Sequence, residues 1–242
     1  MTDNLPVRAH HSNGDSETDR ISSVVERFMG GQGGAASHAR VLSWDFCFEH
    51  FADLDRVRSD RQASCMQLGY YLASWGMLRG SSYLFKNTNA RHYLQALDVI
   101  ERYSSEMREL TPAGFGTQQN QELLVSAYQE LGDALLPEGG RRITLVTKTM
   151  MGVWGVFPSL DSYFVQTFGA IAKERNKSNL FSKFSAKTVE LIGEFYDTHQ
   201  KEIDRLAASH QTVDFVSGLP SGRSIPAAKV IDIYGFGAAY YR

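Results

Sequence analysis

Apolar residues recur at helical spacing along most of the chain from residue 38 onward. Between residues 90 and 110, positions 94, 97, 100, 103, 107 and 110 are apolar and most of the others are polar. This spacing places the apolar residues on one face of a helix. Similar spacing or density of apolar residues predicts helices at about 43–54, 68–75, 119–136, 143–153, 159–175, 186–208 and 226–234. The pattern therefore predicts an all-α fold of about eight helices.

Polar segments rich in glycine and proline separate these stretches. They include 111–117, 137–140 and 217–222, while 213–216 has a short extended pattern and 235–242 reads as a tail. Glycine and proline are the residues that most often interrupt regular elements. Strands do not alternate with helices along the chain, and no repeat of 20–50 residues is present. We expect residues 38–242 to form one globular helical domain.

The first 37 residues differ from the rest because they are polar and small. They contain a run of glycines at 30–34, and only the patch from Ile21 to Met29 has enough apolar residues to form a helix. A polar segment cannot bury enough surface to offset its ordering entropy. We therefore expect residues 1–37 to be a mobile N-terminal segment.

The composition is that of a globular protein. The chain has 242 residues, of which 43% are hydrophobic, so it can bury a sizeable core. Cys47 and Cys65 have neither disulfide-framework nor metal-site spacing and are expected to be buried. No motif implies a cofactor or a metal. No uninterrupted apolar run is long enough to span a membrane, so we expect a cytoplasmic protein with no membrane partner.

Basic residues are concentrated in one segment, although the whole chain has a net charge of −2. Residues 141–187 contain eight basic and two acidic residues. A basic segment of this kind can form a nucleic-acid contact, and the alternative, which is the more common case, is a solvated face. The candidate nucleic-acid ligands in this segment are Arg141, Arg142, Lys173, Arg175 and Lys177.

Arg79 is a further candidate anion ligand. It lies between Gly76 and Gly80, just before Ser81 and Ser82, either of which can cap a following helical turn. Glycines at such a corner permit left-handed backbone, and the N–H groups of a following helix attract anions. The alternative is that Arg79 caps a carbonyl or pairs with an acid.

The longest mostly apolar run, residues 143–164, carries only one lysine and one acid. These two residues, Lys148 and Asp161, are the candidate catalytic pair. An acid can stabilise positive charge on a sugar or activate water, and a desolvated lysine can form a Schiff base. In the alternative interpretation Lys148 reaches the surface from a helix end. Asp161 then lies in the first turn of a helix that Ser159 caps, where the helix dipole favours an acid.

Three stretches together resemble a family of uncharacterised bacterial proteins. They are residues 71–82, residues 145–155 with 157–164, and residues 228–236. The resemblance covers about 40–236 and implies no activity. A second resemblance is to the helix–hairpin–helix DNA glycosylases. Gly152-Val-Trp-Gly155 would then stand for the hairpin, Lys148 for the lysine nucleophile, and Pro158 with Asp161 for the segment with the catalytic acid.

Three functions follow as hypotheses. The preferred one is a nucleic-acid-associated protein, in particular a DNA glycosylase-like hydrolase that uses Lys148 and Asp161. A second is a helical ribonuclease with an Arg-x4-His motif, formed by Arg205 and His210. A third is a non-enzymatic helical module that binds a protein or a small ligand in a bacterial defence context. The first hypothesis depends on whether Lys148, Asp161 and Arg79 share a cleft.

Overall fold

Helices form most of the chain in a computed structural model that describes residues 17–30 and 39–242. The α-helices of these residues are α1 (Glu17–Gly30), α2 (Ser43–Ala52), α3 (Leu54–Ser59), α4 (Arg61–Ser74), α5 (Tyr83–Asn87), α6 (Leu94–Glu109), α7 (Gln118–Leu135), α8 (Ile143–Val153), α9 (Ser162–Glu174), α10 (Ala186–Ser209) and α11 (Ala227–Tyr240). Nine of these eleven helices have seven residues or more. The predicted all-α fold is confirmed.

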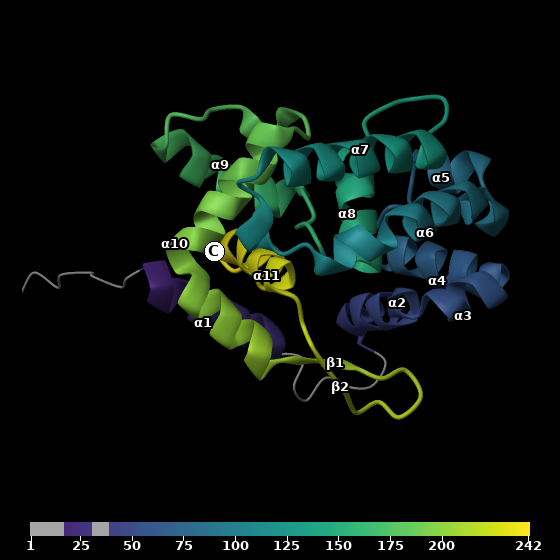
Figure 1. Cartoon of the computed structure of the whole chain (residues 1–242), viewed down its shortest axis with the longest axis horizontal. Helices are drawn as coiled ribbons and strands as arrows, with labels where there is room; N and C mark the ends of the chain where they lie inside the picture. Colours follow the sequence, from purple (N-terminus) through teal and green to yellow (C-terminus); the bar gives the residue numbers. More distant parts are fainter. Residues whose placement is uncertain (1–16, 31–38) are drawn as a thin grey trace, which may run out of the picture.

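The longer helices form two groups that contact each other through α7 and α10, and α8 lies near the middle of the molecule (Figure 1). In one group α11 packs against α1, α9 and α10. In the other, α4 packs against α2 and α6, and α7 packs against α6. Helix α8 contacts α2, α4 and α7, and all its residues except Thr144 are buried. The mostly apolar stretch that begins at Ile143 is therefore buried at the centre of the second group.

Helix α1 is part of the folded core. Ile21 and Val25 are fully buried, and the helix packs on α10 and α11. The helix expected at 21–29 is therefore present, four residues longer at its start and one at its end. The remaining residues of the N-terminal segment that we expect to be mobile, 1–16 and 31–37, lie outside the described residues.

The last helix is longer than its sequence suggests. Two glycines that are expected to follow the helix lie inside it, where they allow close contact with neighbouring helices. Helix α11 continues through Gly235 and Gly237 to Tyr240. A Cβ atom at Gly235 would lie 2.2 Å from the ring of Phe164, and one at Gly237 would lie 2.6 Å from Val24. These glycines let α11 approach α9 and α1 closely, so the expected tail is helical.

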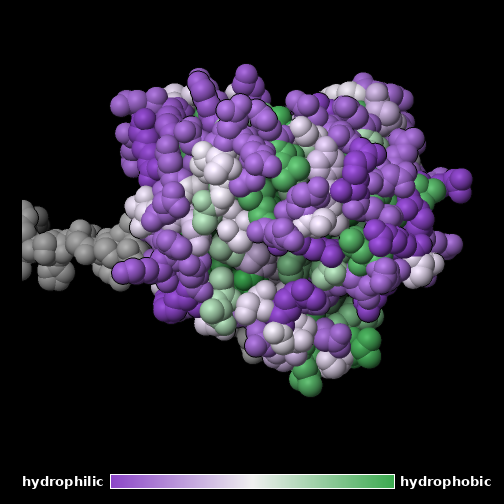
Figure 2. Space-filling model, in the orientation of Figure 1, coloured by the Kyte–Doolittle hydropathy of each residue, from purple (hydrophilic) through white to green (hydrophobic). Residues whose placement is uncertain are grey.

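A small antiparallel hairpin precedes α11. Strands β1 (Gln211–Val213) and β2 (Pro220–Ser224) pair Gln211 with Ser224 and Val213 with Pro220. The backbone N–H of Val213 donates to Asp45 of α2 at 3.1 Å, which ties the hairpin to the domain. Its connecting loop carries three exposed apolar side chains, Phe215, Val216 and Leu219. The hairpin lies at the lower end of the molecule in Figure 1, where Figure 2 shows hydrophobic surface.

Two sequence expectations about the interior can be compared with the structure. Cys47 and Cys65 are buried free thiols, as predicted, and burial raises the pKa of both. Among the helices of the described residues, none combines the length and apolar character that a membrane span requires.

Candidate functional site

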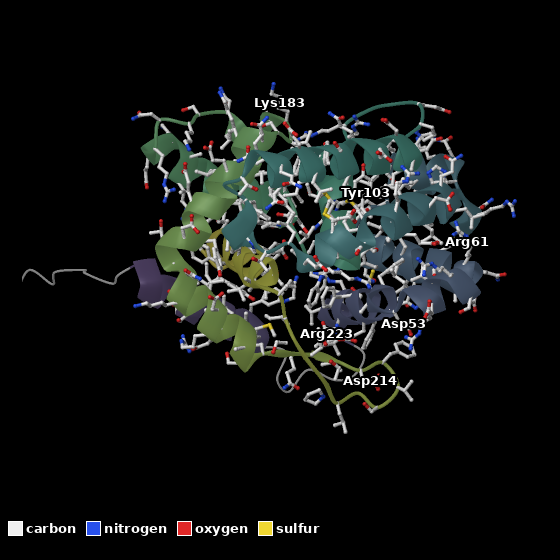
Figure 3. All side chains as sticks on the ribbon, in the orientation of Figure 1. Asp53, Arg61, Tyr103, Lys183, Asp214 and Arg223 are labelled. Carbon is white, nitrogen blue, oxygen red and sulfur yellow. The ribbon has the colours of Figure 1, made fainter. Side chains whose placement is uncertain are left out.

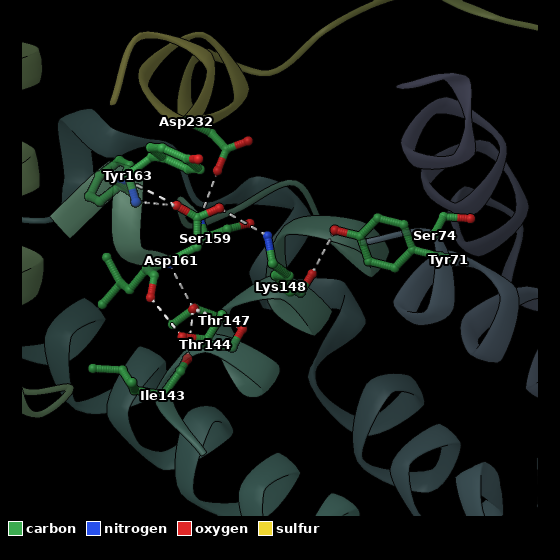
Figure 4. Close-up of polar contacts among 12 residues, drawn as sticks. Tyr71, Ser74, Ile143, Thr144, Thr147, Lys148, Ser159, Asp161, Tyr163 and Asp232 are labelled. Carbon is green, nitrogen blue, oxygen red and sulfur yellow. Dashed lines mark hydrogen bonds and ion pairs between the residues drawn. The ribbon is translucent and has the colours of Figure 1, made fainter. Parts of the chain in front are cut away.

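Lys148 and Asp161 form an ion pair at the junction of the two helix groups. Lys148 lies in α8 and Asp161 directly precedes α9, and Lys148 Nζ is 3.2 Å from Asp161 Oδ2 (Figure 4). The exposed fractions of the two side chains are 6% and 17%. The Tyr71 hydroxyl donates to the carbonyl oxygen of Lys148 at 3.0 Å. Burial raises the pKa of Tyr71 well above its usual value, so this hydroxyl remains a donor.

Asp161 is the N-cap of α9, a position that the sequence analysis gives to Ser159. Asp161 Oδ1 accepts from the backbone N–H groups of Tyr163 at 3.1 Å and Phe164 at 3.0 Å. Ser159 is buried two residues earlier. A carboxylate that caps a helix forms charge-assisted bonds and complements the helix dipole. Both oxygens of Asp161 are therefore engaged, one by the helix and one by Lys148.

A second lysine–aspartate pair lies beside the first. Lys229 and Asp232 of α11 are 2.9 Å apart, with exposed fractions of 8% and 13%. Asp232 Oδ1 accepts from the backbone N–H of Ser159 at 2.8 Å, which links α11 to the segment before Asp161 (Figure 4). This pair is not among the site residues predicted from the sequence, although the i,i+3 spacing of opposite charges within the apolar run Ala228-Lys-Val-Ile-Asp232 indicates it.

Trp75, which follows α4, lies next to both pairs. Lys148 Nζ is 5.4 Å and Lys229 Nζ 5.9 Å from the centroid of its ring, and the Arg40 guanidinium is at 5.0 Å. Cations at this distance are attracted by the indole ring. The Nε1–H of Trp75 is buried and has no hydrogen-bond partner among the described residues. The ring is thus surrounded by positive charge and retains an unused donor.

A cleft of about 970 Å³ opens beside these residues. Lys148, Asp161, Arg79 and Arg141 all line it, together with Arg40 and Trp75. The arrangement on which the first hypothesis depends is therefore present, because the lysine, the acid and Arg79 share one cleft. Among the described residues that line it, four are cationic and one is acidic. The cleft is accordingly suited to an anionic ligand.

The arginines at the entrance differ from the lysine at the floor. Arg40, Arg79 and Arg141 are exposed, and within the described part of the chain none of them has a carboxylate partner. Gly76 has a φ of +77°, and a Cβ atom there would lie 3.5 Å from the Arg79 guanidinium. The corner predicted from the glycines thus holds Arg79 against the backbone. We call Arg40, Arg79 and Arg141 the arginine rim.

Aromatic side chains form another part of the cleft wall. Tyr163, Phe236 and Tyr240 contact one another with ring centroids 5.0–5.4 Å apart. Tyr163 is 40% and Tyr240 is 54% exposed. We call these three residues the aromatic wall. Exposed rings beside free arginines can hold a flat, apolar ligand that carries negative charge.

The other candidate nucleic-acid ligands lie outside the cleft. Arg142 pairs with Asp133 at 2.5 Å, and Arg175 and Lys177 both pair with Glu194, at 3.2 and 2.7 Å. Lys173 is exposed in the last turn of α9. Figure 3 shows that Lys183, from the same basic segment, lies at the edge of the molecule near the start of α10. The segment therefore does not form one continuous surface, and only Arg141 and Lys148 belong to the cleft.

The glycines compared with a DNA-binding hairpin are buried in the core. A Cβ atom at Gly152 would lie 2.3 Å from the ring of Tyr71, and one at Gly155 would lie 2.7 Å from both Phe48 and Pro226. Gly152 is part of α8. A hairpin that holds a DNA backbone has to expose its own backbone. These glycines serve close packing instead, so the geometry does not support the hairpin resemblance.

Arg205 and His210 make separate local contacts. Arg205 donates to the Ser22 hydroxyl at 2.9 Å, and His210 Nδ1 is 2.9 Å from the carbonyl oxygen of Leu206. Neither residue lines the cleft. The structure therefore adds no support to the ribonuclease hypothesis.

No cluster of three or more histidine, cysteine, aspartate or glutamate side chains suited to a metal ion exists in the described ranges. Comparison of the chain with models of known protein families, with curated proteins and with solved structures gives no match. The two family resemblances therefore stay predictions, and the function has to be inferred from the geometry of the cleft.

Proposed function

We propose that the cleft binds nucleotides of a single-stranded nucleic acid. The observation that carries this proposal is the combination of the arginine rim with the aromatic wall in one cleft of about 970 Å³. Phosphates would contact Arg79 and Arg141, and a base would stack on Tyr163 or Tyr240. Proteins that bind single strands commonly combine a cationic groove with aromatic stacking platforms.

The state of the rim arginines supports a role in binding. An arginine already paired with a carboxylate has to break that contact before it binds a phosphate. Arg79 and Arg141 have no such partner among the described residues, whereas Arg142, Arg175 and Lys177 do. Exposed and uncompensated guanidinium groups form bidentate contacts with phosphate oxygens at low cost.

A single strand fits the cleft better than a duplex. The aromatic rings offer flat surfaces, and a base has to leave the stack before an aromatic side chain can cover its face. A volume of about 970 Å³ lies at the upper end of the range for small-ligand sites. It is therefore adequate for one or two unstacked nucleotides, while neighbouring phosphates lie along the rim.

The proposal concerns binding and includes no chemical step. A Schiff-base lysine attacks through a neutral amine, whereas Lys148 donates to Asp161. Asp161 in turn caps α9. These contacts favour a structural role for the pair at the cleft floor more directly than a catalytic role.

The test is a fluorescence anisotropy titration with a short labelled oligonucleotide of deoxyuridine at several salt concentrations. For the wild-type protein we expect binding that weakens with salt, with a log–log slope of about −0.7 for each phosphate contacted. The double variant Arg79→Gln/Arg141→Gln is expected to bind about tenfold more weakly or worse. Its slope should be smaller in magnitude by roughly 1 to 2.

The matched control is Arg175→Gln/Lys177→Gln, which removes two charges of the same basic segment outside the cleft. It is expected to bind like the wild type. The proposal is wrong if the wild type does not bind at low salt, or if its affinity is independent of salt. It is also wrong if the control loses as much affinity as the rim variant.

A further inference from the structure

A second, much smaller cavity lies behind the cleft floor. Its volume is about 20 Å³, which is enough for a single water-sized group. Trp75, Lys148, Asp161 and Phe236 line both the cleft and this cavity, while Lys229 and Asp232 line the cavity but not the cleft. We call this cavity the inner chamber. The cleft and the inner chamber therefore share part of their walls.

Hydrogen-bond donors around the inner chamber exceed the acceptors that they meet. Each of the two ammonium groups has three N–H bonds, and each makes one hydrogen bond to a carboxylate, that of Asp161 or Asp232. The buried Nε1–H of Trp75 has no partner among the described residues. One oxygen of each carboxylate is occupied by backbone N–H groups. A ligand atom that only accepts hydrogen bonds would therefore satisfy the donors that remain unused.

The charges of the inner chamber decide which acceptor fits. Its two lysines and two aspartates carry no net charge together, and it has room for a single atom. A phosphate group is too large, would lie close to two carboxylates, and has the arginine rim as a better partner. A neutral carbonyl oxygen is a single atom and is not repelled by the carboxylates as a phosphate would be, because it accepts hydrogen bonds without adding charge. Burying such an oxygen is favourable only where donors await it.

We infer that the inner chamber selects uracil or thymine over cytosine, and that their keto oxygen O4 is the atom it receives from the cleft. This inference rests on the proposed binding of single strands in the cleft. Lys148, Lys229 and the Trp75 N–H are the donors that can face the oxygen. They are specificity-determining residues, whereas the arginine rim supplies affinity that does not depend on sequence.

Cytosine gives the sharpest contrast. It has nearly the shape of uracil, but an amino group replaces O4. That amino group would direct N–H donors at two ammonium groups and would offer no acceptor to the N–H bonds that are not already used by Asp161 and Asp232. A site built around a hydrogen bond rejects an analogue that cannot form it far more strongly than a site based on shape alone.

The experiment compares oligonucleotides of deoxyuridine and deoxycytidine of equal length on the wild-type protein. Their phosphates are identical, so any difference reports the base. We expect the uracil strand to bind at least about tenfold more tightly, which corresponds to roughly 1.4 kcal/mol. A third strand that contains pyrimidin-2-one, which lacks any group at C4, should lose most of this preference without needing a protein variant.

The variant Lys229→Met/Asp232→Asn removes one ammonium and one carboxylate together and keeps an acceptor for the Ser159 N–H. It should show a clearly smaller preference for the uracil strand, because only Lys148 and the Trp75 N–H remain as donors, and its salt slope should be unchanged. The variant Arg79→Gln/Arg141→Gln should weaken both strands and preserve their ratio. If the Lys229→Met/Asp232→Asn protein does not fold, the affinity of the wild type for the pyrimidin-2-one strand tests whether the group at C4 determines the preference.

The outcomes separate the two proposals. If the wild type binds neither strand, the proposed function is wrong and this inference falls with it. If it binds both equally or prefers cytosine, binding in the cleft stands and the role of the inner chamber is wrong. A uracil preference that is undiminished in the folded Lys229→Met/Asp232→Asn protein also overturns the inference, because the selection would then arise elsewhere.

Discussion

The rim and the floor of the cleft both carry positive side chains, but these differ in their exposure to solvent and in whether a carboxylate neutralises them. Arg79 and Arg141 at the rim are exposed and have no carboxylate partner among the described residues. Lys148 at the floor and Lys229 directly behind it are buried, and each is paired with an aspartate. An exposed charge is solvated by water and costs little to keep free, whereas a buried charge has to be compensated by the protein itself. This difference in pairing suggests different roles for the two regions, because only the unpaired arginines of the rim are available to bind anions.

The two regions should therefore respond differently to mutation. Substitutions at the floor are expected to change the free energy of unfolding, because they leave a buried charge or a cavity behind. Substitutions at the rim are expected to change ligand binding and leave stability within about 0.5 kcal/mol of the wild type. The three predictions below test the floor, from the largest expected effect to the smallest.

Removal of the acid at the floor should have the largest effect. Asp161→Ala leaves the Lys148 ammonium buried without its partner, and it also removes the N-cap of α9. Loss of one partner of a buried pair typically costs about 3–5 kcal/mol. Urea unfolding followed by circular dichroism should show a loss of this size, whereas Arg79→Gln should unfold like the wild type.

The double variant Lys148→Met/Asp161→Asn is the control for that experiment. It removes both charges together, while the asparagine that replaces Asp161 can still cap α9, so it should lose no more than about 1–2 kcal/mol. A loss below about 1 kcal/mol for Asp161→Ala would contradict the description of the floor as a region where charges have to be compensated.

The second prediction concerns Asp45, a carboxyl beside the floor that has no ion pair within the described part of the chain. It is 7% exposed. Burial raises its pKa to about 6, although the Val213 N–H and the nearby Lys229 lower it. The folded protein therefore binds this proton more tightly than the unfolded chain. As a result, the contribution of Asp45 to stability falls as the pH rises from about 4 to about 6.

The size of this effect follows from the difference between the folded and unfolded pKa values. A folded pKa of about 6 against an ordinary value of 3.8 corresponds to roughly 2–3 kcal/mol. Asp45→Asn keeps an acceptor for Val213 and cannot ionise. Its stability relative to the wild type should rise by this amount between about pH 4 and pH 6 in urea unfolding. A difference that does not change with pH would show that Asp45 titrates normally.

The sequence predicts the fold better than it predicts the site, and the reasons are physical. The period of apolar residues identifies α6, α7 and α10 because it depends only on neighbours along the chain. The sequence also indicates the Lys148–Asp161 pair, because two charges in an apolar run require compensation. The partnership of Lys229 with Trp75, and the split of the basic segment between the cleft and Glu194, depend on contacts between distant helices. No local pattern contains that information.

The roles of the glycines are equally hard to predict from the sequence, because they depend on which side chains of neighbouring helices pack against each glycine. Gly235 looks like a helix end in the sequence, yet it lies inside α11 against Phe164. Gly76 and Gly80, in contrast, have positive φ angles and form the corner that the sequence predicts. Backbone conformation of a turn is local, whereas the space that a side chain would occupy is set by the tertiary structure.

The third prediction uses this difference to test how the floor is held in place. Gly152 lies in α8 one turn after Lys148, and a Cβ atom there would lie 2.3 Å from the ring of Tyr71. Tyr71 also donates to the carbonyl oxygen of Lys148. Gly152→Ala should therefore push α8 away from α4 and lower the free energy of unfolding, measured in urea, by about 1–3 kcal/mol.

Gly169→Ala is the matched control, because Gly169 is in the interior of α9 and has no atom within 4 Å of the new methyl group. There alanine should stabilise the helix by about 0.5–1 kcal/mol. Opposite signs for the two substitutions would show that the close approach of α4 and α8 fixes the cleft floor, whereas a gain at both sites would show that the floor can yield.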